Sequence, residues 1–499
     1  MIQVLSVENM RQSDAYAIAN YVSSKDLMFL AGKSAFENVQ WKAPVAIICG
    51  FGNNAGDGYV LAKLLYESNI ECHIILIDEK FSEDGKYFFN ICKEIGVSIK
   101  KWDDVLDLSQ YVTIVDCIFG TGFNGDITGK IKEVIEAINQ SKAYVISIDI
   151  NSGLNGDSGM ADLCVKSDLT ISIGSFKSGH FLSMAKDVMK HKINCDIGIK
   201  PIDTTYELLE YNDLIELFSK RPNFSNKGTY GYIALIGGSK KYTGAIRLAA
   251  MANAALRSGA GVVKVALPKT LYHDLVSLIL ESTIFPLSDN DGEIIFNVEE
   301  ISSLIKNVKT IAFGMGIGIS DETSKILNYL LLNYKGTLII DADGLNVLSQ
   351  VDHSLIKKAE CKIVLTPHLM EFSRLVKRNI DDILSSPIKI AEEYANKLGV
   401  ILLLKGPSTI VTDGKKTYIV DAGCSGMATA GSGDVLSGII AAICAYASDL
   451  LFGVAASAFI NGKAGELAQE KYNSVSMIAS DTISCIPKVI SLIESRKKE

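Results

Sequence analysis

A glycine-rich stretch, residues 423–438, carries the clearest chemical signal in the sequence. Four of its first eleven residues are glycine, and Asp434 stands where an apolar run begins at Val435. Glycines let backbone N–H groups approach an anion closely, and a helix starting near Val435 would direct its positive end at that anion. The stretch therefore predicts a phosphate site in which Asp434 accepts a proton from a substrate hydroxyl during phosphoryl transfer. Taken alone, it also fits a glycine-rich loop in which Asp434 is an ordinary helix N-cap.

Three more polar clusters follow strand-like apolar runs in the C-terminal half. Residues 405–409, Lys-Gly-Pro-Ser-Thr, place a cation, a tight turn and hydroxyls after such a run. Residues 366–371, Thr-Pro-His-Leu-Met-Glu, and residues 341–346, Asp-Ala-Asp-Gly-Leu-Asn, stand in the same relation to the runs before them. Ligands of open α/β sheets bind beyond the carboxyl ends of the strands, so we expect these clusters to converge on one crevice.

Some residues in these clusters also have a plainer interpretation. His368 is either a ligand contact or a turn residue after Pro367, and its place among anion-binding clusters favours the first. Glu371 fits a surface helix residue and a water-mediated magnesium contact equally well. Lys405 is either an anion-binding cation or a solvated strand end.

The N-terminal half shows the same pattern of strand, loop and helix. The apolar run 44–49 leads into the loop 50–58, Gly-Phe-Gly-Asn-Asn-Ala-Gly-Asp-Gly, and a helix is expected over 59–68. This order of elements is typical of a nucleotide site. Asp116 and Asp149 each end a β-branched run. A carboxylate at the end of a buried strand is costly without a partner, which favours a functional role for both.

Strands and helices alternate through the rest of that half. We expect strands at 72–77, 112–116, 144–149 and 169–173, and helices at 85–95 and 129–141. Such alternation predicts a parallel sheet with helices on both faces. Two helices before the first strand, 4–20 and 25–39, are expected to serve packing and not chemistry.

The length of 499 residues suggests two or three domains. The alternation lapses between residues 200 and 226, where Pro201, Pro222 and several charges occur. We therefore expect one domain over 1–205, a linker over 206–226 with a helix at 206–219, and a second domain over 227–499.

Composition narrows the class of protein. The net charge is −8, the sequence pI is about 5.5 and no long basic run is present, so nucleic acid is not an expected partner. Ten cysteines without a Cys-x-x-Cys pair indicate reduced core residues. The apolar stretch 435–460 is split at Asp449 and predicts two buried helices, not a membrane span. The N-terminus lacks a signal-peptide pattern, and we expect a cytoplasmic protein.

With residues 236–239, Ile-Gly-Gly-Ser, and 314–318, Gly-Met-Gly-Ile-Gly, the C-terminal clusters resemble the ribokinase-like superfamily. More narrowly, they are similar to its ADP- or ATP-dependent NAD(P)H-hydrate dehydratases from about residue 227 onward. The resemblance implies an α/β fold, Mg²⁺ with ADP or ATP, and Asp434 as the catalytic base. It implies substrate contacts at Ala245, Gly316, His368 and Asp434, and nucleotide contacts at Lys405, Gly406, Pro407, Ser408, Thr409 and Gly433. Met370 departs from the family, which commonly has Gly there, and would narrow one wall of the site.

The N-terminal motifs resemble the NAD(P)H-hydrate epimerase family over about residues 1–200, which implies a Rossmann-like parallel sheet sandwich. The implied substrate contacts lie in two loops and at one strand end: Asn53, Asn54, Ala55, Gly56, Asp57, Gly120, Thr121, Gly122, Phe123, Asn124, Gly125, Asp126 and Asp149. Asp149 is also the candidate acid/base residue. Ala55 stands where the family usually has Gly.

The same resemblance implies that Asn54, Asp116 and Ser152 bind potassium. Oxygen ligands alone suit any hard cation and do not separate potassium from magnesium. The single carboxylate among the three leads us to expect the monovalent ion.

Together, the two resemblances imply a bifunctional enzyme for NADHX and NADPHX, the hydrated forms of NADH and NADPH. The C-terminal domain would phosphorylate the ring hydroxyl of the S form so that phosphate can leave, and the N-terminal domain would interconvert the R and S forms. Alternatives are a vitamin or sugar kinase of the ribokinase superfamily and a non-catalytic dinucleotide-binding scaffold. The presence of Asn54, Asp116 and Asp149 disfavours the scaffold. We expect a homo-oligomer, and the choice between ADP and ATP stays open.

Overall fold

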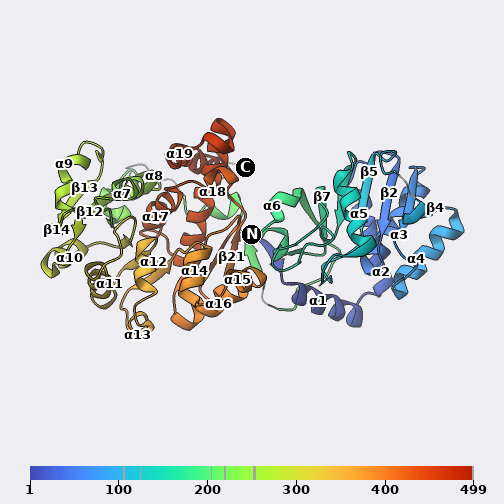
Figure 1. Ribbon diagram of the computed structural model, residues 1–499, viewed down its shortest axis with the longest axis horizontal. Coiled ribbons are helices and arrows are strands. Elements are labelled where there is room, and N and C mark those ends of the chain that lie inside the picture. The colour runs from blue at the N-terminus through green and yellow to red at the C-terminus, as the bar shows by residue number, and fades with distance from the viewer. Residues whose placement is uncertain (105–106, 124, 204, 219–220, 251–253, 497–499) are drawn as a thin grey trace. The chain divides into compact units, whose positions relative to one another are not determined.

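The computed structural model describes residues 1–104, 107–123, 125–203, 205–218, 221–250 and 254–496 (Figure 1). The chain forms two compact units. The N-terminal unit comprises Gln3–Tyr206, and the C-terminal unit comprises Glu207–Glu499 with Met1–Ile2. Each is an α/β unit built on a largely parallel sheet, which confirms the predicted fold class.

The N-terminal sheet is parallel throughout, in the order β4-β3-β2-β5-β6-β7-β9. Its strands are β2 (Val45–Cys49), β3 (Cys72–Leu76), β4 (Ser98–Lys101), β5 (Thr113–Cys117), β6 (Tyr144–Ile148), β7 (Ser167–Ile173) and β9 (Met189–Cys195). The predicted strands are confirmed, but the sequence gives no clear signal for β4 and β9. Both are edge strands with several charged or polar residues, so neither forms the apolar run of a central strand. Outside this sheet, β1 (Ile2–Leu5) pairs in parallel with β8 (Phe176–Lys177).

Helices cover both faces of this sheet because side chains alternate along each strand. Val45, Ile47 and Cys49 of β2 pack with one cluster of helices, whereas Ala46 and Ile48 pack with residues of α5. The first cluster draws on α2 (Ser24–Glu37), α3 (Asn53–Glu67) and α4 (Glu83–Ile95), and α5 spans Gly129–Gln140. All five residues of β2 are fully buried, which explains the unbroken apolar run in the sequence.

The first helix begins later than predicted. α1 spans Val7–Asn20, and the Ser6 hydroxyl caps it by accepting a hydrogen bond from the Asn9 backbone N–H. Residues before Ser6 form β1, because pairing with β8 gives their backbone groups partners. α3 instead begins earlier than predicted, at Asn53, so the loop after β2 is short.

The C-terminal sheet has the order β13-β12-β11-β16-β17-β18-β19-β20-β21-β10. It is parallel except for β20, which is antiparallel to both neighbours. Its strands are β10 (Tyr206–Leu208), β11 (Tyr232–Ile236), β12 (Val262–Pro268), β13 (Thr283–Leu287), β16 (Thr310–Phe313), β17 (Thr337–Ile340), β18 (Lys362–Leu365), β19 (Ile401–Leu404), β20 (Thr409–Thr412) and β21 (Thr417–Val420). β14 (Asp289–Asn290) and β15 (Glu293–Ile294) form a separate antiparallel pair.

A large apolar cluster joins this sheet to α7 (Thr243–Ala250), α8 (Ala254–Arg257), α17 (Ser432–Ile443), α18 (Leu450–Ser476) and α19 (Ala479–Ser495). The remaining helices of this unit are α9 (Tyr272–Leu275), α10 (Val298–Ile305), α11 (Asp321–Asn333), α12 (Asp343–Leu348), α13 (His353–Lys357), α14 (Leu369–Val376), α15 (Ile380–Ser385) and α16 (Pro387–Leu398). α17 and α18 are the two buried helices predicted from the apolar stretch 435–460, and Asp449 caps α18 through the Phe452 N–H. Within the part of the chain that the structure describes, no helix is long and apolar enough to cross a membrane.

The helix predicted at 206–219 is wrong. β10 opens this segment and pairs in parallel with β21, and a 3-10 turn follows at Tyr211–Leu214. Leu209 and Leu214 are buried in the apolar cluster of the C-terminal unit. Tertiary packing against a sheet edge therefore decides the conformation here, and Ser219 lies outside the described residues.

Candidate active sites

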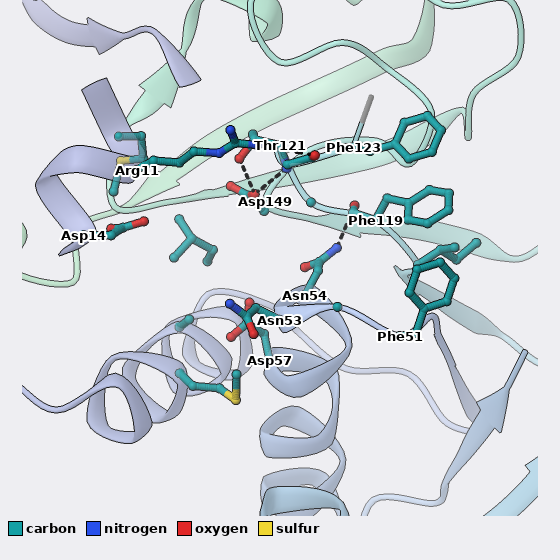
Figure 2. Close-up of a pocket in the computed structure, with 18 of the residues that line it drawn as sticks. Arg11, Asp14, Phe51, Asn53, Asn54, Asp57, Phe119, Thr121, Phe123 and Asp149 are labelled. Atoms are coloured by element: carbon teal, nitrogen blue, oxygen red, sulfur yellow. Dashed lines mark hydrogen bonds between the residues drawn. The ribbon is translucent and has the colours of Figure 1, made fainter. Parts of the chain in front are cut away.

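A pocket of about 790 Å³ lies at the carboxyl ends of β2, β5 and β6 in the N-terminal unit (Figure 2). Its lining includes most of the predicted substrate contacts: Asn53, Asn54, Asp57, Gly120, Thr121, Gly122, Phe123, Asp126 and Asp149. Ala55 and Gly56 are buried in the first turn of α3, and Gly125 is exposed outside the lining. Asn124 lies outside the described residues. The loops after three neighbouring strands thus meet at one pocket.

Asp149 is held by contacts to both carboxylate oxygens. Its Oδ1 lies 2.6 Å from Lys177 Nζ, and its Oδ2 accepts hydrogen bonds from the Thr121 backbone N–H (2.9 Å) and hydroxyl (3.1 Å). Burial acts to raise the pKa of Asp149, but the Lys177 charge and these hydrogen bonds outweigh it and hold the pKa below its ordinary value. Asp149 is also one of the few non-glycine residues with positive φ, at 65°. Such strain is typical of functional sites.

Lys177 is a site residue that the sequence did not reveal. It comes from β8, its side chain is only 2% exposed, and Nζ also donates to the Ile173 carbonyl at 2.9 Å. A buried ammonium requires a paired carboxylate, which Asp149 supplies. A lone Lys between Phe176 and Ser178 in a buried segment was the available signal, but its partner is distant in sequence.

α1 contributes to the pocket as well, so the expectation that this helix serves packing alone is wrong. Met10, Arg11 and Asp14 line the pocket. Burial and the nearby Asp149 charge raise the pKa of Asp14 to about 6, although Lys177 opposes the shift. Burial, with the charges of Asp149 and Asp14, also raises the pKa of Asp57 well above its ordinary value.

Asn54, Asp116 and Ser152, the predicted potassium ligands, are all buried, and Asn54 also lines the pocket. Ser152 Oγ donates to Asp116 Oδ1 at 2.5 Å, and the Ser152 N–H donates to Oδ2 at 2.9 Å. Asn54 Nδ2 donates to the carbonyls of Phe119 (2.8 Å) and Ile148 (3.2 Å). Asn54 Oδ1 is buried without a partner among the described residues. Burial raises the pKa of Asp116, and its hydrogen bonds oppose that shift.

One end of the pocket is aromatic. Phe119 and Phe123 are stacked with ring centroids 4.2 Å apart, and Phe51 meets Phe119 edge-on at 5.7 Å. Figure 2 shows these rings on one side of the pocket and Arg11, Asp14 and Asp149 on another. The pocket therefore offers separate places for a flat apolar group and a polar, reacting group.

An ion pair between the buried Asp341 and the partly buried Lys405 forms the centre of the C-terminal site. Asp341, directly after β17, has Oδ1 2.9 Å from Lys405 Nζ, and its Oδ2 accepts from the Ser437 hydroxyl at 2.6 Å. A Cβ placed on Gly433 would lie 3.4 Å from Lys405 Nζ, so the glycine loop closely approaches this pair. The Asp341 charge raises the pKa of Lys405 despite its burial. Lys405 is thus not a solvated strand end, and the sequence had not singled out Asp341 as its partner.

Asp434 lies in the first turn of α17, beside this pair. The N-cap is Gly431, with no side-chain cap, so the interpretation of Asp434 as an ordinary N-cap is wrong. Burial and the nearby Asp341 charge raise the pKa of Asp434 to about 7, with Lys405 opposing. A carboxyl group with such a pKa can exchange its proton at neutral pH, as a general base requires. The Ser432 hydroxyl in the same turn is buried without a partner among the described residues.

His368 both caps a helix and adjoins this cluster. Its Nδ1 accepts from the N–H groups of Met370 (3.1 Å) and Glu371 (3.3 Å) at the start of α14, and its backbone bridges to Lys405. Burial and the Lys405 charge lower the pKa of His368 and favour the neutral ring. Because Nδ1 accepts hydrogen bonds, the neutral ring carries its proton on Nε2. Glu371 is 7% exposed and accepts from the His368 N–H at 2.9 Å, so its interpretation as a surface residue is wrong. Met370 is exposed.

The other predicted C-terminal contacts fall into two groups. A Cβ on Gly316, which has φ 65°, would lie 2.9 Å from the Ala245 Cβ, so these two residues adjoin. They stand near a second cavity of about 760 Å³ lined by Ser239, Tyr242, Gly318 and Asp343, whereas Asp434, Lys405 and His368 lie outside its lining. In the other group, Gly406 and Pro407 are exposed and Thr409 begins β20. Ser408 is buried and its hydroxyl donates to Asp421 at 2.9 Å.

Comparisons with known proteins bear on both sites. A family model described as NAD(P)H-hydrate dehydratase matches residues 233–488, and one described as YjeF-related protein N-terminus matches residues 24–179. A relative from Thermofilum pendens, named bifunctional NAD(P)H-hydrate repair enzyme Nnr, is 30% identical over 98% of this chain and 96% of its own. A relative of the same name from Coxiella burnetii is 31% identical over 94% of this chain and 96% of its own. The chain belongs to the bifunctional NAD(P)H-hydrate repair enzymes.

Solved structures support the fold of the C-terminal unit of this repair enzyme. An ADP/ATP-dependent NAD(P)H-hydrate dehydratase from Bacillus subtilis, co-crystallised with ATP and Mg²⁺, is 23% identical, with a TM-score of 0.51, and covers 58% of this chain and 99% of its own. A hypothetical protein from Streptococcus mutans is 26% identical, with the same TM-score, and covers 57% of this chain and 99% of its own. The expected ribokinase-like fold is confirmed. The repair enzyme combines an epimerase unit with a dehydratase unit, and a kinase fused to a scaffold does not account for the full-length match.

Proposed function

We propose that the dehydratase unit phosphorylates the ring hydroxyl of S-NAD(P)HX, with Asp434 as the base, and then eliminates phosphate. The observation that carries this proposal is the place of Asp434 in the first turn of α17, beside the Asp341–Lys405 pair, with its pKa raised to about 7. The backbone N–H groups at the start of a helix suit phosphate oxygens. Lys405 supplies a positive charge at the same place, and Asp341 holds it there.

The chemistry follows from the hydroxyl being a poor leaving group. Asp434 takes the hydroxyl proton as the oxygen attacks the terminal phosphorus of ADP or ATP, and the remaining nucleotide leaves. The lone pair of the ring nitrogen then expels phosphate from carbon 6, and loss of a proton from carbon 5 restores the double bond. Ala245, Gly316 and His368 would contact the substrate, and Lys405, Gly406, Pro407, Ser408, Thr409 and Gly433 the nucleotide.

Magnesium would accompany the nucleotide and neutralise charge on its phosphates. Among the described residues, no group of three or more His, Cys, Asp or Glu side chains is arranged to hold a metal ion. The phosphates and water would therefore supply most of its ligands, with Glu371 reached through water.

In the epimerase unit we propose that Asp149 contacts the dinucleotide and acts in proton transfer. The aromatic end of the pocket would take the adenine ring, because flat rings stack on Phe faces. The polar end would then receive the hydrated nicotinamide. Asn53, Asn54, Asp57 and the loop 120–126 would bind the remainder, with Ala55 and Gly56 supporting that wall from within α3.

We further propose potassium for the buried cluster of Asn54, Asp116 and Ser152. Within the described part of the chain Asn54 Oδ1 is buried without a partner, and oxygens of Asp116, Ser152 and Phe119 lie in the same cluster. A hard monovalent cation suits these oxygens and a single carboxylate. When bound, it would fix the loops after β2 and β5, which carry substrate contacts. Self-association of the chain and a cytoplasmic location stay predictions.

Incubating the full chain with a mixture of R- and S-NADHX and either ADP or ATP, while recording the return of reduced-nicotinamide absorbance, tests both units. We expect complete conversion with at least one nucleotide, at a rate well above spontaneous epimerisation for the R form. Conversion that stops when the S form is consumed would remove the epimerase assignment. Absence of any nucleotide-dependent conversion would remove the dehydratase assignment.

A further inference from the structure

Epimerisation at carbon 6 needs two proton-transfer groups if it proceeds by ring opening. One group takes the proton of the hydroxyl, the C–O bond becomes a carbonyl, and the carbon 6–nitrogen bond breaks. Its electron pair passes to the ring nitrogen, which takes a proton from the second group. After rotation about the carbon 5–carbon 6 bond, the nitrogen attacks the other face of the carbonyl and both protons return. No oxidant or reductant is involved.

Asp149 fills one of these roles only. Its oxygens accept from Lys177 and Thr121, and these partners keep it ionised, so it can accept the hydroxyl proton but has no proton of its own to donate. A carboxyl group that donates must instead be protonated part of the time and free of such partners. The pocket therefore needs a second acid.

Asp14 meets this requirement by position. It projects from α1 into the pocket, whereas Asp149 enters at the end of β6 and Asp57 from α3, as Figure 2 shows. No hydrogen bond or ion pair engages the Asp14 carboxyl group among the described residues. It is half-buried, so a substrate in the pocket would exclude water from it.

We propose that Asp14 is a second catalytic residue of the epimerase, donating a proton to the ring nitrogen when Asp149 accepts the hydroxyl proton. This proposal rests on the epimerase function of the pocket. The groups facing Asp14 are Lys177 of β8, Asp149 after β6, Asp57 of α3 and Arg11 of its own helix. Burial and Asp149 together keep the Asp14 carboxyl group partly protonated near pH 6 despite Lys177.

Asp57 is the other acidic side chain of the pocket that lies near Asp149. Burial, with the charges of Asp149 and Asp14, raises its pKa well above the ordinary value. The Arg11 guanidinium offers several N–H donors and serves better as a hydrogen-bond donor to substrate phosphate.

The test compares Asp14→Asn with the unchanged full chain, using purified R-NADHX and saturating nucleotide. We expect kcat for R-NADHX consumption to fall about 10²–10⁴-fold, or to the spontaneous rate, with KM nearly unchanged. Consumption of S-NADHX should be unaffected. In the unchanged chain the rate with R-NADHX should fall as the pH rises through about 6, because Asp14 must be protonated to donate. This dependence should be absent from the variant. Asp14→Glu should restore part of the rate.

Glu8→Gln is the matched control, because Glu8 is an exposed carboxylate of the same helix outside the pocket lining. Its rates should equal those of the unchanged chain. Wild-type kcat in Asp14→Asn, or a loss confined to KM, would overturn the role of Asp14. If the unchanged chain does not accelerate R-NADHX consumption above the spontaneous rate, the epimerase function itself fails, and the inference with it.

Discussion

Replacing Lys177 with Met tests how the epimerase site is held together. Met has nearly the same length and volume, so altered packing should cost less than about 1.5 kcal/mol. The larger effect is electrostatic, because Asp149 is only 16% exposed and would lose its counter-charge. Removing one partner of a buried ion pair typically costs about 3–5 kcal/mol. We therefore expect Lys177→Met to lower the free energy of unfolding of the N-terminal unit by about that amount at pH 7.

Tryptophan fluorescence measures this change in the full chain, because both tryptophans, Trp41 and Trp102, belong to the N-terminal unit. With a urea m-value of about 1–3 kcal/mol/M, the midpoint should fall by at least about 1 M. The double variant Lys177→Met/Asp149→Asn removes both charges and should recover much of the lost free energy of unfolding. The reasoning would be refuted if Lys177→Met alone lowered the free energy of unfolding by less than about 1 kcal/mol, or if the double variant were no more stable than Lys177→Met.

The pH dependence of the same measurement follows from the lowered pKa of Asp149. A carboxyl group with a lowered pKa contributes stability that is fully present above its unfolded pKa, about 3.9, and is lost as pH falls through the folded pKa. In Lys177→Met the buried carboxylate lacks its cation, so its pKa should rise. The difference between the two proteins should therefore be largest at neutral pH and shrink in acid.

Three further predictions concern the other sites. Asp434→Asn should slow nucleotide-dependent dehydration by about 10²–10⁴-fold with nucleotide binding retained, and the wild-type rate should rise with pH through about 7 because the base must be ionised; a wild-type rate in the variant would contradict this. Asp116→Asn should weaken R-NADHX binding and abolish dependence on potassium while S-NADHX dehydration is unchanged; epimer exchange in potassium, sodium and magnesium buffers measures this, and a strict need for magnesium would exclude potassium. A fragment starting at Thr205 should fold and consume only S-NADHX, whereas one starting at Asn223 lacks β10, Leu209 and Leu214 and should unfold at lower temperature; equal melting temperatures would show that this segment adds no stability.

The parts of the structure visible in the sequence are those that depend on local pattern. Central strands such as β2 appear as apolar runs, and a carboxylate at the end of one such run identified Asp149 as a candidate. The glycine-rich stretch before a helix identified Asp434. What the sequence did not reveal depends on pairing between distant segments. Lys177 is 28 residues from Asp149, and Lys405 is 64 residues from Asp341. β10 has too few residues to signal a strand without the edge of β21.

The place of α1 in the pocket wall affects how domain boundaries should be chosen for this chain. The N-terminal family model matches residues 24–179, which leaves out Met10, Arg11 and Asp14 as well as β9. A fragment cut to those limits would retain the central strands but lack one wall of the pocket and an edge strand of the sheet. Inactivity of such a fragment would reflect the missing wall and strand, so assays of the isolated epimerase require the chain from its first residue through β9.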